Sequence, residues 1–247
     1  MQKNTSHILS ELFLFLLCLT LLSSLFSLLA KQDSDPSLPQ SGMTQNDPLT
    51  APIFVLDPGH GGEDAGAVAE NGALEKNLNL EMALLVADIL RACGHRVLLT
   101  REKDVLLYDP SSNYLGHKKE QDLATRLRIA EEAPNAIFVS IHMNAYPQTQ
   151  YSGLQVWYSP NHPASALYAE DLQTAVQAHL QPENTRRTKK AGSNIYLLKR
   201  LECPAILIEC GFLSNPAEAE ALCDPSYRQR LALLIALSLM ETEGKQP

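Results

Sequence analysis

The sequence predicts an α/β fold: a single three-layer domain in which helices cover both faces of a mostly parallel, twisted β-sheet. Two observations lead to this prediction. Short apolar runs alternate with segments of helical periodicity through residues 51–247, and such alternation favours a parallel sheet. Several of the runs are apolar at every position, as strands covered on both faces must be.

Five apolar runs are predicted to be strands, and four segments between or after them to be helices. The first run is "IFVLD", and the segment that follows it carries Leu78, Met82, Leu85, Val86 and Ile89 at helical spacing. The later runs are "HRVLLT", "AIFVSIH", "LQVWYS" and "AILIEC". In residue numbers, the strands are 53–57, 95–100, 136–142, 154–159 and 205–210, and the helices are 76–92, 119–132, 163–180 and 226–243.

The amino-terminal 50 residues are not expected to belong to this domain. Residues 1–30 contain an uncharged run from Leu12 to Ala30, about the length of a membrane span and longer than the usual apolar core of a cleaved signal. Cleavage after Ala30 would also place Leu28 where a small residue is preferred. We therefore expect an uncleaved membrane anchor, with secretion after signal cleavage as the alternative. Residues 31–50 are rich in Pro, Ser, Asp and Gln and are predicted to be a disordered linker.

Charge and cysteine content exclude some classes of function. The net charge of −8 argues against a nucleic-acid partner, because binding to phosphates needs a concentrated basic surface. The five cysteines are odd in number and lack a C-x-x-C spacing. We therefore expect neither a disulfide framework nor a cysteine zinc site.

Three polar residues stand where predicted strands end. His60 follows the first strand within "VLDPGHGG", His142 ends the "AIFVSIH" strand, and Glu209 lies near the end of "AILIEC". In open α/β sheets the functional groove lies outside the carboxyl ends of the strands. Each residue alone has an ordinary structural explanation, which for Glu209 is a buried ion pair. Together they suggest a metal site, since imidazole suits zinc and a perturbed carboxylate beside it can act as a base.

A catalytic zinc usually keeps three protein ligands and one open position, so two histidines need a third partner. Spacing does not choose among the carboxylates near the first motif. No H-E-x-x-H zinc motif is present, and the glycine-rich turn lacks the G-K-[ST] ending of a phosphate-binding loop. The candidates for the third ligand are Asp57, Glu63, Asp64, Glu70, Glu75 and Glu81.

Four ordered motifs, "VLDPGHGGEDAGA", "LEKNLNLEMA", "SIHMNA" and "ILIECGFLSN", resemble those of the zinc-dependent N-acetylmuramoyl-L-alanine amidases. The resemblance implies one zinc ion per chain and peptidoglycan as the substrate. It implies that His60, Glu75 and His142 hold the metal and that Glu209 is the catalytic acid and base. Two further residues are candidates for contact with substrate or for support of the ligands. Asn144 would face the same way as His142 on an extended strand, and Arg126 resembles an arginine that recurs in such enzymes.

Within this family, the anchor, the "SLPQSG" linker, the absence of wall-binding repeats and the stretch "NTRRTKKAGSNIYLLKR" resemble the spore-cortex amidases of endospore-forming bacteria. That resemblance implies a catalytic domain on the outer side of the cytoplasmic membrane and a role in forming muramic δ-lactam. Whether an accessory protein takes part stays open. Two alternatives remain: a zinc peptidase that cuts within the stem peptide, and a non-catalytic, membrane-anchored wall-binding protein.

Overall fold

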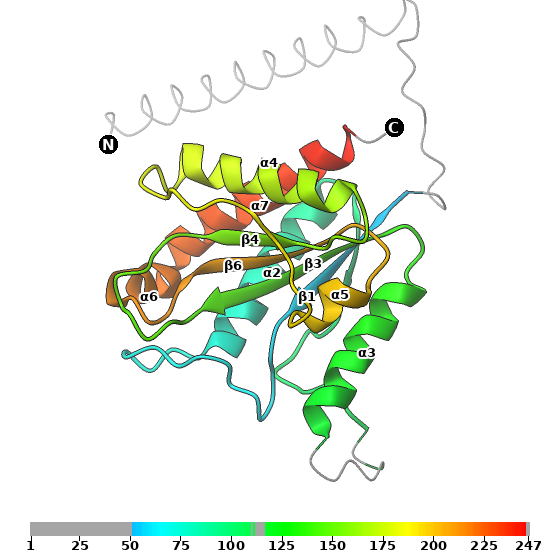
Figure 1. Ribbon diagram of the computed structural model, residues 1–247, viewed down its shortest axis with the longest axis horizontal. Coiled ribbons are helices and arrows are strands. Elements are labelled where there is room, and N and C mark those ends of the chain that lie inside the picture. Colours follow the sequence, from blue (N-terminus) through cyan, green and yellow to red (C-terminus); the bar gives the residue numbers. More distant parts are fainter. Residues whose placement is uncertain (1–50, 110, 112–116, 246–247) are drawn as a thin grey trace, which may run out of the picture. The chain divides into compact units, whose positions relative to one another are not determined.

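The computed structural model describes residues 51–109, 111 and 117–245 (Figure 1). The predicted membrane segment at 1–30 and the predicted linker at 31–50 lie outside the described residues. Within the described part, no helix is both long enough and apolar enough to cross a membrane.

A six-stranded sheet forms the centre of the fold, with the strand order β2-β1-β3-β6-β4-β5. The first four strands in this order are mutually parallel, and β4 runs antiparallel to β6. The prediction of a mostly parallel sheet is therefore confirmed. All five predicted strands are present, whereas β5 was not predicted because its two exposed lysines carry no apolar signal. The strands are β1 (Ile53–Pro58), β2 (Arg96–Leu99), β3 (Ala136–Asn144), β4 (Gln155–Tyr158), β5 (Lys189–Lys190) and β6 (Ala205–Phe212).

Helices cover both faces of the sheet, which gives the expected three layers (Figure 1). One face packs against α2 (Glu75–Ala92), α4 (Ala164–His179) and α7 (Pro225–Glu243). The other packs against α3 (Lys118–Glu132) and the short α5 (Tyr196–Arg200). The four predicted helices are present, but α5 and α6 (Pro216–Cys223) were not predicted. Five residues are too few to show a helical period in α5, and α6 begins with Asn215 as a capping residue and Pro216 at its first turn.

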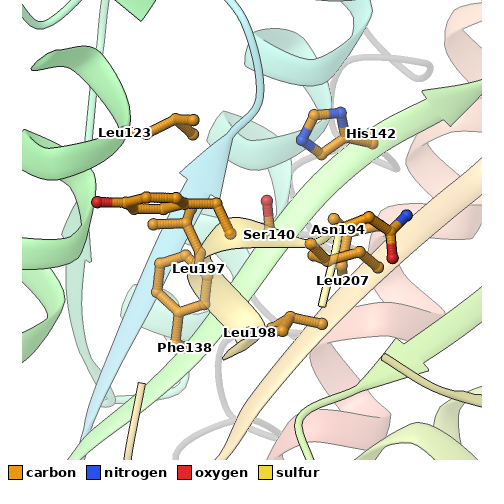
Figure 2. Close-up of a pocket in the computed structure, with 10 residues that line it drawn as sticks. Leu123, Phe138, Ser140, His142, Asn194, Leu197, Leu198 and Leu207 are labelled. Atoms are coloured by element: carbon orange, nitrogen blue, oxygen red, sulfur yellow. The ribbon is translucent and has the colours of Figure 1, made fainter. Parts of the chain in front are cut away.

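Alternation along the strands decides which side chains reach the functional edge. On β3, Ile141 joins the core beneath α2, whereas Phe138 joins the core beneath α3. Because successive side chains point to opposite faces, Ser140 and His142 continue the face of Phe138, as Figure 2 shows. Glu209 lies opposite His142 on β6. The sheet face beneath α3 is thus apolar at its centre and becomes polar toward the carboxyl ends of its strands.

Candidate metal centre

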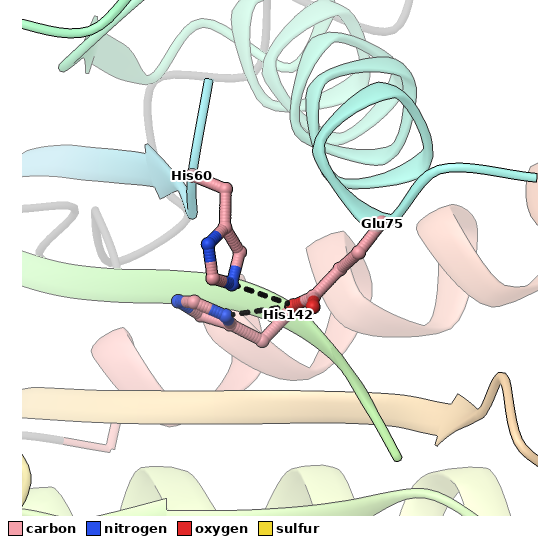
Figure 3. Close-up of side chains that lie close together, drawn as sticks. All are labelled: His60, Glu75 and His142. Atoms are coloured by element: carbon pink, nitrogen blue, oxygen red, sulfur yellow. Dashed lines mark hydrogen bonds and ion pairs between the residues drawn. The ribbon is translucent and has the colours of Figure 1, made fainter. Parts of the chain in front are cut away.

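His60, Glu75 and His142 converge at the carboxyl edge of the sheet, although they come from a loop, a helix and a strand (Figure 3). The Glu75 Oε1 atom lies 3.2 Å from His60 Nε2 and 2.9 Å from His142 Nδ1. The two imidazole rings stand nearly perpendicular, with centroids 5.0 Å apart. One ligand atom from each residue lies within 4.8 Å of the other two. The three side chains therefore form a cluster of donors that could hold one metal ion.

Two glycines make room for this cluster. A Cβ atom on Gly59 would lie 2.1 Å from His142 Cε1, so any other residue there would displace the imidazole ring. A Cβ atom on Gly66 would lie 2.5 Å from Glu75 Oε2, and the φ of +66° at Gly66 favours glycine as well. The glycines of the first motif thus let the backbone pass close to the donors.

His60 itself has an unusual backbone conformation, with a φ of 61°. This left-handed conformation costs a residue with a side chain about 1–2 kcal/mol, so the surrounding structure must hold it. Two buried arginines do so by donating to three successive carbonyl oxygens. Arg101 donates to the oxygens of Pro58 and Gly59, both at 2.9 Å. Arg126 donates to the oxygen of Pro58 at 2.8 Å and to that of His60 at 2.7 Å.

Arg126 also completes a buried network of charges. Its Nη1 lies 2.6 Å from Asp57 Oδ1, and its Nε lies 2.7 Å from Asp122 Oδ2. Burial alone would raise the pKa of Asp57, but the Arg126 charge and hydrogen bonds from Thr100, Arg126 and Ser140 hold that pKa below its usual range. Arg126 therefore lies behind the donors and positions the His60 loop.

Glu75 is fixed on both carboxylate oxygens. The backbone N–H of Ala67 donates to Oε2 at 2.8 Å, and that of Met143 donates to Oε1 at 3.1 Å. Burial alone would raise the pKa of Glu75, but its hydrogen bonds with His142 and His60 outweigh burial and hold the pKa well below the usual range. The carboxylate is therefore ionised and oriented without any rearrangement, as a metal ligand must be.

The far side of the His60 ring faces a second carboxylate. Asp64 Oδ2 lies 2.9 Å from His60 Nδ1, and metal-binding histidines usually donate their other ring N–H to such a group. Burial lowers the pKa of His60, but the nearby carboxylates of Glu75 and Asp64 outweigh this and raise it. Asp64 thus lies against the ring at an ion-pair distance without hydrogen-bond geometry, and Nε2 points at the donor cluster.

Glu209 lies beside the cluster and not within it. It is the partner of His142 across β3 and β6. Burial raises the pKa of Glu209 to about 7, an effect that the His142 charge opposes and the Glu75 charge reinforces. Its Oε2 atom is buried and has no hydrogen-bond partner among the described residues. This arrangement leaves a buried carboxyl oxygen with unused hydrogen-bonding capacity beside the donor cluster.

The other predicted residues lie outside the cluster. The β3–β6 register shifts after His142, so Asn144 faces Phe212 and accepts a hydrogen bond on its backbone oxygen from Leu213 at 2.7 Å. Of the six carboxylates that spacing left open, Glu75 joins the histidines, Asp57 pairs with Arg126, Glu63 with Lys118 and Glu81 with Arg228, Asp64 supports His60, and Glu70 is exposed.

A pocket of about 220 Å³ opens next to His142, between α3 and α5 (Figure 2). Phe138 and Leu207 form its floor on the sheet, and Leu123 and Leu197 close it from the two helices. The pocket is mainly apolar and adjoins the donor cluster through His142. The site therefore combines a polar reaction centre with an apolar recess.

Three supporting residues, Arg101, Asp122 and Asp64, had no supporting role in the sequence prediction. Asp64 was considered only as a ligand, and Arg101 was not singled out. Arg101 follows the second predicted strand directly and so stands at the same sheet edge as His60. Its position after a strand is the one signal that could have drawn attention to it.

Comparisons with known proteins agree with this geometry. The family described as N-acetylmuramoyl-L-alanine amidase (Amidase_3) matches residues 54–241. The germination-specific N-acetylmuramoyl-L-alanine amidase of Bacillus subtilis is 37% identical over 202 residues, which cover 81% of this chain and 84% of that protein. The CwlD amidase of Clostridioides difficile, solved in complex with the GerS lipoprotein, is 34% identical with a TM-score of 0.75, over 78% of this chain and 99% of that one.

A further solved structure is the catalytic domain of CwlV, an amidase from Bacillus (Paenibacillus) polymyxa var. colistinus. It is 31% identical with a TM-score of 0.64, over 78% of this chain and 99% of that one. The family match spans most of the chain and includes the loop, helix and strands that carry the donor cluster and Glu209. The chain belongs to the N-acetylmuramoyl-L-alanine amidase family.

Proposed function

We propose that this chain is a zinc-dependent N-acetylmuramoyl-L-alanine amidase. Its reaction is hydrolysis of the amide bond between the lactyl group of N-acetylmuramic acid and L-alanine in peptidoglycan. One observation carries this proposal: the convergence of His60, Glu75 and His142 beside Glu209, whose inner carboxyl oxygen is unpartnered among the described residues.

The donor set fits zinc. Two imidazoles and one carboxylate are typical ligands of a catalytic zinc site, which leaves one coordination position open. His60 Nε2, His142 Nδ1 and a Glu75 oxygen would hold the ion, and Asp64 supports His60 from behind. When bound, zinc would polarise the substrate carbonyl and lower the pKa of water to about 7.

Glu209 supplies the proton transfers of the reaction. With its pKa raised to about 7, the carboxyl group can accept a proton from the attacking water and return it to the leaving nitrogen near neutral pH. Its buried Oε2 is the atom with free hydrogen-bonding capacity. In this proposal the neighbouring His142 is a ligand and Glu209 is the acid and base, so two adjacent strand residues have separate roles.

The apolar pocket beside His142 suits the small apolar groups next to the scissile bond. Both the lactyl group and L-alanine carry a methyl group, and burial of a methylene-sized group contributes about 0.8 kcal/mol. Phe138, Leu207 and Leu197 would contact such a group. This placement seats the substrate on the same sheet face as Glu209.

A role in the spore cortex is part of the proposal. The relative in Bacillus subtilis is named as germination-specific, and the chain covers most of its length. Amide cleavage here would prepare peptidoglycan for the formation of muramic δ-lactam. The uncharged run at residues 12–30 would anchor the chain with its catalytic domain outside the cytoplasmic membrane. The CwlD amidase was solved with a lipoprotein, and on that ground we include a lipoprotein partner, which copurification from sporulating cells would test.

The deciding experiment combines metal analysis with product analysis on the purified full-length chain. One zinc ion per chain and free lactyl groups on the muramic acid of digested peptidoglycan are expected. Shortened stem peptides would instead identify a zinc peptidase. Binding to peptidoglycan without any cleavage product would identify a wall-binding protein.

A further inference from the structure

Two exposed tyrosines lie on the loop that follows β3, close to the reaction centre. Tyr146 and Tyr151 are 51% and 40% exposed, whereas every other Phe, Tyr and Trp in the described part of the chain is buried or half-buried. Their rings touch edge to face, with centroids 5.2 Å apart. Both exposed aromatic residues are therefore concentrated in one surface feature, which chance placement on a surface would not favour.

This feature is connected to the face of the sheet that carries Glu209. The Tyr151 ring lies 6.3 Å from the ring of Phe212 at the end of β6. Phe212 is the partner of Asn144, two positions beyond His142. While β3 advances two residues from His142 to Asn144, β6 advances three from Glu209 to Phe212, which marks a bulge. The extra residue returns Phe212 to the face of Glu209, and a Cβ on Gly211 would point toward α6.

Arg186 holds the rings in place and links them to the strand beside Glu209. Its guanidinium group lies 4.4 Å from the Phe212 centroid and 5.8 Å from that of Tyr151. Its Nε donates to the Ser152 oxygen at 2.6 Å, and its Nη1 donates to Gln155 Oε1 at 3.4 Å. Gln155 is the direct partner of Glu209 across β4 and β6. Arg186 thus connects the Tyr151 ring to the residue paired with Glu209 in the sheet.

We propose that Tyr146, Tyr151 and Arg186 form a subsite for a sugar ring of the glycan strand, namely the ring next to the N-acetylmuramic acid whose amide is cut. This inference rests on the proposed function. The C–H face of a pyranose is apolar and its rim carries hydroxyl groups, which suits exposed tyrosine rings beside a guanidinium group. Phe212 and Arg186 already hold the Tyr151 ring, and the Tyr146 ring packs against it, so binding orders little further.

The position of Arg186 favours a sugar over a stem peptide as the occupant. The scissile amide joins a sugar to a peptide, so both lie near Glu209 in a productive complex, and the chemistry of the subsite decides between them. The stem peptide carries carboxylates, for which an outward-pointing guanidinium would be the expected partner. Arg186 instead lies over the aromatic rings and donates to Ser152 and Gln155.

The test compares two substrates on the full-length chain: a glycan chain bearing stem peptides, and a single N-acetylmuramoyl peptide. Tyr151→Ala should lower kcat/KM for the chain substrate roughly three- to tenfold more than for the single-sugar substrate, as loss of one aromatic contact predicts. Tyr151→Phe, which keeps the ring, should behave like the wild type. Leu237→Ala, at an exposed apolar position on α7, is the surface control. Tyr146→Ala repeats the test should Tyr151→Ala lower the melting temperature.

Calorimetric titration with a tetrasaccharide of N-acetylglucosamine tests the subsite without any cleavage. Tighter binding by the wild type than by Tyr151→Ala is expected. Equal binding by the two, equal loss of kcat/KM on both substrates, or a Tyr151→Phe variant as impaired as Tyr151→Ala would overturn the inference. An absence of amide hydrolysis by the zinc-loaded wild type would refute the proposed function instead, and the titration would still decide the subsite.

Discussion

Replacement of Glu209 by glutamine should lower turnover but raise the stability of the metal-free protein above pH 7. In most buried ion pairs, removal of one charge destabilises the protein because the partner is left alone. Glu209 forms no ion pair with the described residues, and its Oε2 is buried without a hydrogen bond from them. Its burial raises the pKa from 4.5 to about 7. The ionised carboxylate is therefore a cost to the folded state, and a neutral amide of the same size should remove that cost.

The size and sign of the effect follow from proton linkage. A carboxyl group whose pKa is raised on folding stabilises the protein fully only below its unfolded pKa, and that stability is lost as the pH rises through the folded pKa. The window here runs from about pH 4.5 to about pH 7. The shift corresponds to an upper limit of about 3 kcal/mol. Because solvent reaches part of the side chain, screening reduces the expected gain to about 1–3 kcal/mol at pH 8.

The assay is thermal unfolding of metal-free wild type and Glu209→Gln at pH 4 and pH 8. The two proteins should melt together at pH 4. At pH 8 the variant should melt roughly 2–12 °C higher, since a gain of about 1–3 kcal/mol is multiplied by about 2–4 °C per kcal/mol for a domain of this size. On the zinc-loaded proteins, metal content should be equal, while turnover of the variant falls by about 10²–10⁴, the usual contribution of a positioned acid and base.

Three results would refute this reasoning. A lower melting temperature for Glu209→Gln at pH 8 would show that the carboxylate has a cationic partner. Loss of zinc from the variant would make Glu209 a ligand. Near-normal turnover in a folded, zinc-loaded variant would remove Glu209 from the mechanism.

Four further predictions test the ligands, their support and the location of the chain. His142→Ala should lose zinc and activity together, and full zinc occupancy measured by elemental analysis would contradict its role as a ligand. Gly59→Ala should weaken zinc retention by displacing the His142 ring, whereas Gly72→Ala, where a Cβ meets open space, should retain zinc at a cost of about 1–2 kcal/mol in stability. Arg126→Ala should destabilise the protein by about 3–5 kcal/mol in chemical unfolding, with Arg126→Lys intermediate. In protoplasts, external protease should remove the catalytic domain and leave a membrane fragment containing residues 12–30; release of a domain starting at Lys31 would instead show signal cleavage.

Much of the fold could be predicted because its signals are local. The strands β1, β2, β3 and β6 each contain a short run of apolar residues, and α2 shows its buried face in the spacing of Leu78, Met82 and Val86. The antiparallel direction of β4 was not predicted, since an apolar run has no sign of direction. The strand β5 and the helix α5 depend on neighbouring elements for their formation. Their own sequences therefore do not predict them.

The donor cluster could be predicted only in part from residue patterns. His60, His142 and Glu209 each stand at a strand end, and parallel strands bring such positions to one edge. Glu75 is the first residue of α2. Its position in the cluster depends on the loop before α2, where Gly66 passes close to the carboxylate and the Ala67 N–H donates to it. Spacing alone could not select it, and the family resemblance did.

The structure shows how one carboxylate is chosen from several candidates. A carboxylate with a close cation is neutralised and held by that cation, so it makes a poor ligand for a second one. Arg126 pairs with Asp57 and so excludes it as a ligand. Lys118 lies 2.8 Å from Glu63 and excludes that carboxylate in the same way. Among the described residues, Glu75 receives only neutral backbone and amide donors apart from the two histidines, which become ligands when neutral. Which carboxylate is free to bind the metal therefore depends on where the arginines and lysines lie. These cations are distant in sequence from the carboxylates with which they pair. A pattern of acidic residues along the chain cannot contain that information.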